Sequence, residues 1–379
     1  MVQTLAGKQI VVAVTGSIAA VEIVKLIHAL RRKGAVVQPV MSPAAAGIIH
    51  PDALTYAAGR ETITRISGKV EHVLCCGDGG SADLLLIAPC TANTIGKIAH
   101  AIDDTTVTTF ATTAIGSRLP VLIVPAMHHS MYRHPGVTKN IAKLKGWEIN
   151  ILVPVIEEEK AKIAGNEEIV LQCERALLGR PLTGKRVLIT SGPCREPVDD
   201  IRILTTRSSG RMGHELALAA FRLGADVTVV HNDSFPCVEN VHAETAGDMR
   251  REVLRILGER GVDIYISAAA ISDFSPVRAK GKIPSGKEVA LKLLPQPKLL
   301  DEVRAHGPAT VIAFKLGEDQ EGKAREMIAT GISMVLVNEP GTMGSGSGEY
   351  QLITANESLQ LRGTKEEIAS KVLHHVVSP

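Results

Sequence analysis

GKRVLITSGPCREPVDDIRILTTRSSGRMG, residues 184–213, decides the fold, because a strand–loop–helix plan begins there for the second time in the chain. The apolar run 187–189 is too short for an independent helix, and the turn 190–193 ends it sharply, as at the end of a buried parallel strand. Small residues and one cation at 208–213 then precede an apolar helical pattern that starts at Leu216. Backbone amides at such turns and helix starts can bind an anion, so this stretch predicts a phosphate-binding segment.

Length and composition favour a globular α/β protein of roughly two to three domains. Of the 379 residues, 45% are hydrophobic and only 3% aromatic, which indicates cores of aliphatic side chains, typical of parallel sheets covered by helices. Lys and Arg number 42 against 40 Asp and Glu, a formal net charge of +2. With no strong net field, we expect neither nucleic acid nor membrane as a partner.

Six cysteines without a CxxC pair or a disulfide-like framework favour a reducing compartment. The start of the chain lacks the pattern of a signal peptide, and no apolar run approaches the ~18 residues that span a bilayer. We therefore expect a cytoplasmic protein.

Four apolar runs in the first half, at 10–14, 36–41, 82–88 and 120–125, are each followed by a tight loop and a helical pattern. Strands that alternate with helices predict an open, mostly parallel sheet, whose ligands bind beyond the carboxyl ends of the strands. The second half repeats this plan, because 184–190 resembles 7–12 and 223–230 resembles 33–40. We expect an α/β protein with two Rossmann-like domains, 1–180 and 181–379, divided near 179–181 after an amphipathic helix.

The glycine-rich stretches match no standard phosphate loop. Neither G-x-G-x-x-G nor G-x-x-x-x-G-K-[ST] occurs, so a dinucleotide fingerprint and a Walker loop are both missing. GTMGSGSGEY, at 341–350, is by default a flexible loop, and a nucleotide flap is the less favoured interpretation. His128, His129 and His134 lack any ligand spacing for a metal, so none is predicted there.

In combination these motifs resemble the bifunctional phosphopantothenoylcysteine decarboxylase/phosphopantothenate–cysteine ligase family of coenzyme A biosynthesis, in its archaeal branch. The resemblance covers nearly the whole chain. In the first half it rests on TGSIAA, Glu71-His72-Val73, PCTANTIGKIA and PAMHHSMY. In the second half it rests on ITSGPCREPVDDIR, SSGRMG, AAAISDF, the GKI loop at 281–283, AFK at 313–315, and Asn338.

For the second half the resemblance implies a ligase. The carboxylate of 4'-phosphopantothenate would attack the α-phosphate of CTP, and the amine of cysteine would then displace CMP, with Mg²⁺ neutralising the triphosphate. Lys282 is the matched residue for stabilising the transition state. The matched substrate-binding positions are Gly192, Ser208, Ser209, Gly210, Arg211, Asp273, Lys282, Phe314, Lys315 and Asn338.

For the first half the resemblance implies a flavodoxin-like flavoprotein domain with FMN. The flavin would oxidise the cysteinyl end of 4'-phosphopantothenoylcysteine, carbon dioxide would leave, and the flavin would return the hydride. His72 is the matched acid/base residue, and His128 and Met131 are matched substrate residues. The flavin-binding positions are Gly16, Ser17, Ser42, Thr91 and Asn93.

Three positions depart from the family pattern. His128 and Thr206 each stand where Asn is usual, and the segment 159–168, with Lys162, replaces a bacterial flap that carries a cysteine. Two other functions stay open: a flavin-binding regulatory or scaffold protein in which only the ligase half is active, and a nicotinamide oxidoreductase, which the missing G-x-G-x-x-G disfavours. The family also implies a homo-oligomer, with trimeric flavoprotein halves and paired ligase halves.

Overall fold

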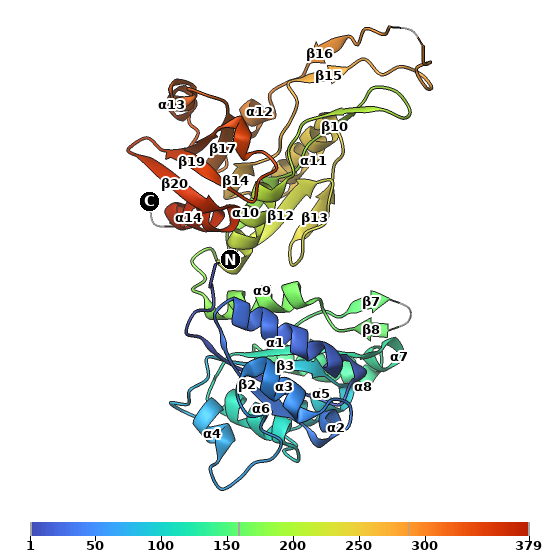
Figure 1. The fold of residues 1–379 in the computed structure, drawn as a ribbon, viewed down its shortest axis with the longest axis vertical. Helices are drawn as coiled ribbons and strands as arrows, with labels where there is room; N and C mark the ends of the chain where they lie inside the picture. The colour runs from blue at the N-terminus through green and yellow to red at the C-terminus, as the bar shows by residue number, and fades with distance from the viewer. Residues whose placement is uncertain (1, 158–159, 287, 378–379) are drawn as a thin grey trace. The chain divides into compact units, whose positions relative to one another are not determined.

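The computed structural model describes residues 2–157, 160–286 and 288–377. The chain forms two compact units, residues 1–179 and 180–379, each built on its own sheet (Figure 1). Within the described residues, no helix is both long and apolar enough to cross a bilayer.

The first unit is organised around a parallel sheet with the strand order β2–β1–β3–β4–β6, which is the flavodoxin-like order. Its elements are β1 (Gln9–Val14), η1 (Ile18–Glu22), α1 (Ile23–Arg32), β2 (Val36–Met41), α2 (Pro43–Ala46), α3 (Pro51–Ala58), α4 (Glu71–Cys76), β3 (Leu84–Cys90), α5 (Ala92–Ala99), α6 (Thr106–Gly116), β4 (Val121–Pro125), β5 (Met127–His128), α7 (His129–Tyr132), α8 (Pro135–Gly146), β6 (Asn150–Ile151), β7 (Val155–Glu157), β8 (Lys160–Lys162) and α9 (Asn166–Leu177).

Strand β1 shows why both faces of this sheet need helices. Ile10 and Val12 pack into a core with α1, α3 and α9, whereas Val11 and Ala13 pack into a second core with α5 and α6. Every residue of β1 after Gln9 is buried and apolar, so the strand has no face that water could cover.

The second unit has an eight-stranded sheet of order β13–β12–β9–β14–β17–β18–β19–β20, parallel up to β18 and antiparallel beyond it. Its elements are β9 (Arg186–Thr190), β10 (Arg195–Pro197), β11 (Ile203–Thr205), α10 (Arg211–Arg222), β12 (Asp226–His231), β13 (Glu239–His242), α11 (Ala246–Glu259), β14 (Ile264–Ser267), β15 (Phe274–Pro276), β16 (Leu293–Pro295), α12 (Leu299–Ala305), β17 (Thr310–Leu316), α13 (Glu321–Ala329), β18 (Met334–Asn338), η2 (Pro340–Thr342), β19 (Ser347–Ile353), β20 (Ser358–Thr364) and α14 (Lys365–Val377).

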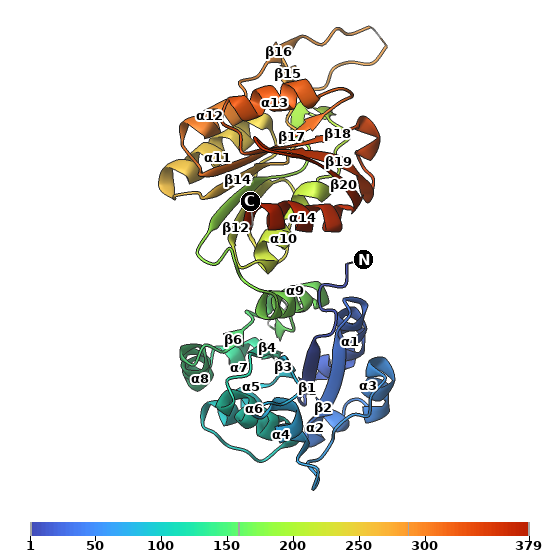
Figure 2. The ribbon, with the colours of Figure 1, turned by 90° about the vertical axis from the view of Figure 1, so that its left-hand side faces the viewer.

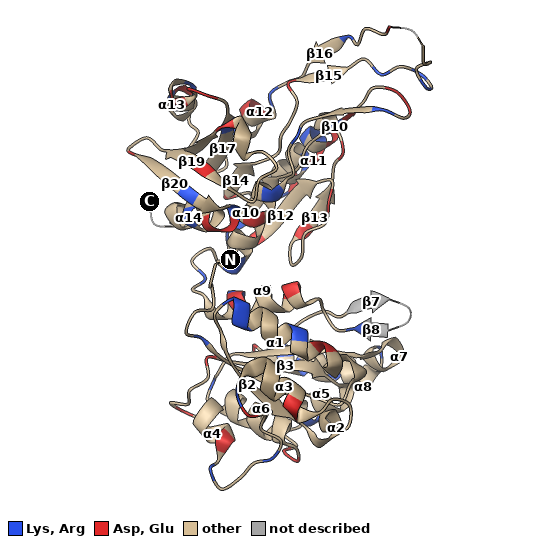
Figure 3. Cartoon of the chain, viewed as in Figure 1, with Lys and Arg blue, Asp and Glu red and all other residues tan. Residues whose placement is uncertain are grey.

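Helices cover both faces of the second sheet as well, with α10 and α14 on one face and α11, α12 and α13 on the other (Figure 2). Two antiparallel ribbons, β10–β11 and β15–β16, lie outside the main sheet. Lys and Arg are interspersed with Asp and Glu in both units (Figure 3), in keeping with the small net charge. The predicted fold class, two Rossmann-like α/β units with mostly parallel sheets, is confirmed.

The internal repeat has a physical basis at the start of each sheet. The Asp83 carboxylate accepts the Gln9 backbone N–H at 2.7 Å and lies 3.4 Å from the Lys8 ammonium. Asp263 accepts the Arg186 N–H at 2.8 Å and lies 3.4 Å from Lys185. In both units, an aspartate just before the strand that pairs with the first strand (β3 with β1, β14 with β9) thus satisfies the first backbone donor of that first strand.

Two sequence expectations need correction. The third strand begins at Leu84 and ends at Cys90, two residues later than predicted at each end, and Asp83, just before it, bonds to the start of β1 instead. The glycine-rich stretch 341–350 is a loop only in part, since β19 starts at Ser347. Tyr350 and Leu352 alternate into the core from this strand, and pairing with β18 and β20 fixes the segment.

Candidate functional site

Two adjoining cavities of the second unit lie where the carboxyl ends of its parallel strands meet the start of α10. They have volumes of about 570 and 450 Å³, and both are lined by Ser208, Ser209, Gly210, Arg211 and Gly344. We call them the first and the second cavity. The first extends toward the ends of β9 and β12, and the second toward the ends of β14, β17 and β18.

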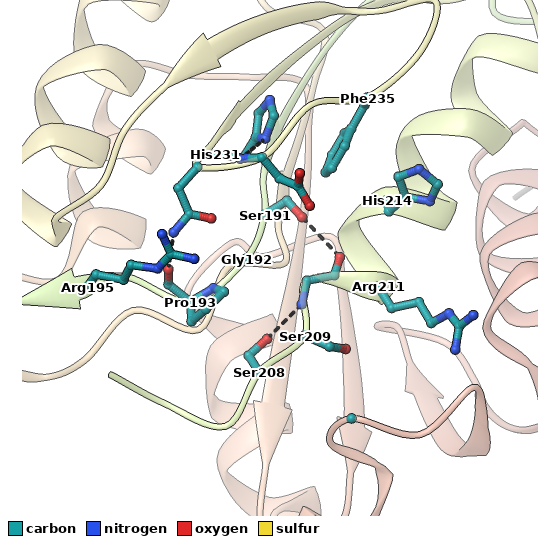
Figure 4. A pocket seen from close by; sticks show the side chains of 14 residues that line it. Ser191, Gly192, Pro193, Arg195, Ser208, Ser209, Arg211, His214, His231 and Phe235 are labelled. Carbon is teal, nitrogen blue, oxygen red and sulfur yellow. Dashed lines mark hydrogen bonds between the residues drawn. The ribbon is translucent and has the colours of Figure 1, made fainter. Parts of the chain in front are cut away.

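The start of α10 presents backbone donors to both cavities. Its N-cap residue is Gly210, at φ 69°, which has no side chain to cap the first turn. The Ser191 hydroxyl donates to the Gly210 carbonyl at 3.1 Å, and the Gly210 N–H donates to the Ser208 hydroxyl at 3.3 Å (Figure 4). The first N–H groups of the helix are therefore uncapped, and together with the helix dipole they favour an anion.

Two glycines allow α10 to approach β9 this closely. A Cβ on Gly210 would lie 3.0 Å from the Gly192 Cα, and the positive φ of Gly210 is itself strained for other residues. A Cβ on Gly213 would lie only 2.3 Å from the Ser191 hydroxyl oxygen. The motif SSGRMG therefore sets the distance between the helix and the first loop.

Most of the substrate residues that the resemblance implies line these cavities. Gly192 and the segment 208–211 line the first cavity. The same segment lines the second cavity, together with Asp273, Phe314, Lys315 and Asn338. Thr206 also lines the second cavity, and its hydroxyl accepts the Ser208 N–H at 3.4 Å.

Lys282 is not among the residues that line either cavity. It lies in the loop between β15 and β16, where the N–H of its neighbour Ile283 donates to the Asp199 carboxylate at 3.0 Å. Asp199 is buried and also accepts the N–H groups of Ile201 and Arg202, at 2.8 and 2.6 Å. These backbone hydrogen bonds, with Ile283 first, hold the pKa of Asp199 well below its ordinary value. Asp199, which the sequence did not single out, thus fixes the backbone of the lysine loop.

Sequence reasoning also missed an aromatic wall of the first cavity. The ring of His231 stacks on Phe235 at a centroid distance of 4.3 Å, and His214 meets the same ring edge-on at 4.8 Å. His231 Nδ1 accepts the Asp233 N–H at 2.9 Å, so its proton is on Nε2, which donates to Asn240 at 2.8 Å. Burial lowers the pKa of His231, in keeping with a neutral ring whose Nδ1 accepts a hydrogen bond. No local motif marks these residues, although His231 ends β12 and Phe235 follows it, at a strand end where this fold carries ligand contacts.

In the first unit, the loops after β1, β2 and β3 converge at one edge of the sheet. The buried Thr15 hydroxyl donates to the Pro89 carbonyl at 2.7 Å and accepts the Thr91 N–H at 3.1 Å. A Cβ on Gly16 would lie 2.6 Å from the Ala44 Cβ. Thus the loop after β1 is bonded to the loop after β3 and touches the loop after β2.

Three of the matched flavin residues are the N-caps of short helices at this edge. Ser17, Ser42 and Thr91 cap η1, α2 and α5 through side-chain oxygens that accept backbone N–H groups. Asn93 is exposed on the first turn of α5. Several hydroxyls and helix starts in one place suit a phosphate-bearing cofactor.

The histidines of the first unit differ in their surroundings. His72, on α4, has a buried Nδ1 without a hydrogen-bond partner within the described residues, and its ring meets Phe110 edge-on at 6.4 Å. His128 and Met131 are exposed. The neighbouring His129, not selected from the sequence, has a buried Nδ1 that also lacks a partner among the described residues.

The segment that replaces the bacterial flap pairs with the strand of His128. In a three-stranded sheet of order β5–β8–β7, His128 is opposite Lys160. Lys162 ends β8, whereas Glu159, at the start of the replacing segment, lies outside the described residues. The flap position is therefore adjacent to one of the matched substrate residues.

Comparisons with known proteins agree along the chain. Residues 2–177 match the Flavoprotein family, and residues 182–378 match the DNA/pantothenate metabolism flavoprotein C-terminal domain. The Coenzyme A biosynthesis bifunctional protein CoaBC of Thermococcus kodakarensis is 42% identical and covers 97% of this chain and 94% of its own length. Its namesake from Methanocaldococcus jannaschii is 35% identical and covers 98% of this chain and 94% of its own length. A crystal structure of the C-terminal domain of a CoaBC protein is 27% identical, covers 53% of this chain and 97% of that chain, and has a TM-score of 0.45.

Proposed function

The chain belongs to the family of bifunctional proteins of coenzyme A biosynthesis, and from this premise we propose how its residues divide the work. It is a bifunctional enzyme with a phosphopantothenate–cysteine ligase activity and a phosphopantothenoylcysteine decarboxylase activity. Matches over both halves disfavour a scaffold protein in which only the ligase half is active. We assign the decarboxylase to residues 1–180 and the ligase to residues 181–379.

The observation that carries the ligase assignment is the pair of adjoining cavities around the uncapped start of α10. We propose that the backbone N–H groups of α10, with Ser208, Ser209 and Arg211, bind 4'-phosphopantothenate. Asp273, Phe314, Lys315 and Asn338 then bind CTP from the other wall of the second cavity. The two substrates meet there, so that the carboxylate can attack the α-phosphate in an oriented complex.

Magnesium would enter with the nucleotide. Among residues 2–157, 160–286 and 288–377, no three His, Cys, Asp or Glu side chains are placed to hold a metal ion. Mg²⁺ commonly binds through substrate phosphates and a few protein groups, so this arrangement suits a metal held mainly by CTP. Lys282 is proposed to reach the developing charge through its loop, whose backbone Asp199 anchors.

The first unit fits a flavin. Ser17, Ser42 and Thr91 cap helices in the three loops that converge at this edge, and Gly16 allows two of these loops to touch. We propose that this edge holds the phosphate of FMN. The flavin, when bound, accepts and returns the hydride. His72, with its unpartnered buried Nδ1, is the residue proposed to move the proton of the substrate. For this enzyme we also propose a cytoplasmic location and homo-oligomeric assembly, as the family implies.

The test is conversion of 4'-phosphopantothenate, cysteine and CTP with Mg²⁺, followed by mass spectrometry. We expect 4'-phosphopantetheine, formed through 4'-phosphopantothenoylcysteine. A stall at the ligated product would refute the decarboxylase assignment, and no ligation with CTP, ATP or GTP would refute the ligase assignment.

Matched variants test the division between the units. His72→Asn should abolish carbon dioxide release and leave ligation unchanged, whereas the control His100→Asn, at an exposed residue, should change neither. Lys282→Gln should slow CMP formation, and the control Lys280→Gln, two residues away on an exposed position, should not. Loss of both activities in His72→Asn would contradict separate sites.

A further inference from the structure

The second cavity contains a buried lysine that neither the sequence motifs nor the proposed function uses. Lys365 is the first residue of α14, is only 5% exposed and lines this cavity. Buried lysines are rare in proteins unless their charge is paired. The burial of a lysine at this position therefore needs an explanation.

Three features of the surroundings oppose the charge of Lys365. Burial lowers the pKa of its ammonium, and the positive charge of Arg211 lowers it further. In addition, Lys365 is at the positive end of the α14 dipole, where cations are unfavourable. The site without ligand thus holds a cation at a cost.

No described residue compensates this charge with a hydrogen bond or ion pair to the Lys365 ammonium. The two acidic residues that follow have other contacts: Glu366 lies 3.7 Å from the Arg222 guanidinium, and Glu367 accepts the Thr364 N–H at 2.7 Å. The described residues therefore supply no direct partner for the Lys365 ammonium, and a ligand in the cavity could supply one.

Arg211 lines the same cavity and adds a second positive charge to it. Its side chain extends away from the Ser191–Gly192 loop in Figure 4. A Cβ built on Gly346 would lie 3.1 Å from its Nη1 atom, and the Gly346 carbonyl accepts the Lys365 backbone N–H at 3.0 Å. Gly346 therefore adjoins both cationic residues, which come from helices at opposite ends of the unit's sequence.

We propose that Lys365 is a substrate-binding residue of the ligase, which together with Arg211 binds a phosphate group in the second cavity. A phosphate would remove all three unfavourable features at once, because it supplies the missing counterion, separates the two like charges and offers acceptors to the ammonium. The uncapped N–H groups of α10 line the same cavity and favour the same anion.

This inference rests on the proposed function, since both ligase substrates carry phosphate. The phosphomonoester of 4'-phosphopantothenate and the triphosphate of CTP share the required chemistry. Kinetics of a Lys365 variant distinguish the two substrates. The KM for the substrate whose phosphate contacts Lys365 should rise, and the KM for the other substrate should stay unchanged.

The experiment compares Lys365→Met, which keeps the length of the side chain, with the charge-conserving Lys365→Arg. The control is Lys371→Met, on an exposed position of the same helix. We expect Lys365→Met to raise one KM by about 10- to 100-fold, the range for a lost hydrogen bond to a charged group. Lys365→Arg should restore most of the affinity, and Lys371→Met should match the wild type. Unchanged KM values for both substrates in Lys365→Met would overturn the inference.

A second readout does not depend on catalysis and shows whether the role is structural. Without anions, Lys365→Met should melt at a higher temperature than the wild type, because it removes a desolvated cation that Arg211 and the start of α14 both disfavour. Inorganic phosphate should raise the melting temperature of the wild type more than that of Lys365→Met. A lower melting temperature of Lys365→Met together with equal responses to phosphate would overturn the inference and make Lys365 a packing residue.

The role of Lys365 and the proposed ligase function can be refuted independently. If the wild type ligates and Lys365→Met does so with wild-type KM values, only the role of Lys365 falls. If the wild type does not ligate with any nucleotide, the proposed function falls, and the phosphate response of the wild type and Lys365→Met still decides whether the lysine binds an anion.

Discussion

Gly213→Ala would test whether the close packing of α10 against the first loop holds the ligase site together. The new Cβ would lie 2.3 Å from the Ser191 oxygen, 2.6 Å from its Cβ and 3.2 Å from its Cα. Rotation about χ1 of Ser191 moves its oxygen but not its Cβ, so it cannot remove the clash at 2.6 Å. The helix or the loop must shift, and the Ser191–Gly210 hydrogen bond is lost.

The expected cost follows from three terms. Overpacking costs about 1–3 kcal/mol, and the lost hydrogen bond about 1 kcal/mol. Alanine gains up to about 1 kcal/mol over glycine in a helix. The net loss for the second unit is about 1–3 kcal/mol, which for a unit of this size lowers its melting temperature by about 2–12 °C.

Denaturation with urea can separate the two units. The single tryptophan, Trp147, lies in the first unit, so its fluorescence follows that unit, whereas far-ultraviolet circular dichroism follows both. Gly213→Ala should shift only the unfolding transition of the second unit, which circular dichroism detects and the fluorescence does not. The ligase activity should fall, whereas decarboxylation of added 4'-phosphopantothenoylcysteine should stay unchanged.

Two further variants make the test specific. Gly258→Ala, on α11, has no atom within 4 Å of its new Cβ and should leave the second unit equally or more stable. Ser191→Gly removes the clashing side chain, so the double variant should be more stable than the two single changes predict by addition. Wild-type stability of Gly213→Ala, or strictly additive effects, would refute the packing argument.

The first unit offers two more predictions. Thr15→Val leaves the Thr91 N–H without its acceptor, whereas the Pro89 carbonyl keeps the Thr15 N–H at 3.3 Å, so we expect a loss of about 1–3 kcal/mol in the Trp147 fluorescence transition; an unchanged midpoint would count against this bond. Hydrogen bonds from Ser67 lower the pKa of Glu71 from 4.5 to about 2, so its stabilisation is complete above pH 4.5 and is lost as the pH falls through about 2. The stability difference between the wild type and Glu71→Gln should shrink over that interval, and a constant difference would disprove the shift.

Alternating apolar runs and loops were enough to predict the two parallel sheets, because a strand that is buried on both faces leaves a clear local pattern. The same reasoning could not find β19 within a glycine-rich stretch, since its pairing partners, β18 and β20, fix that segment. Lys365 was missed for a related reason. Nothing next to it in the sequence is unusual, and only the fold brings it to Arg211.

The order of elements along the chain gives the contact of α14 with α10 a consequence for protein synthesis. Helix α10 is synthesised early in the second unit, whereas Lys365 leaves the ribosome only after every strand of that unit's main sheet. Domains tend to fold as they emerge, from the N-terminus onward. A nascent chain can therefore complete its flavoprotein fold while the second cavity still lacks one wall. Chains that stop before α14 should therefore lose ligase activity while the first unit stays folded.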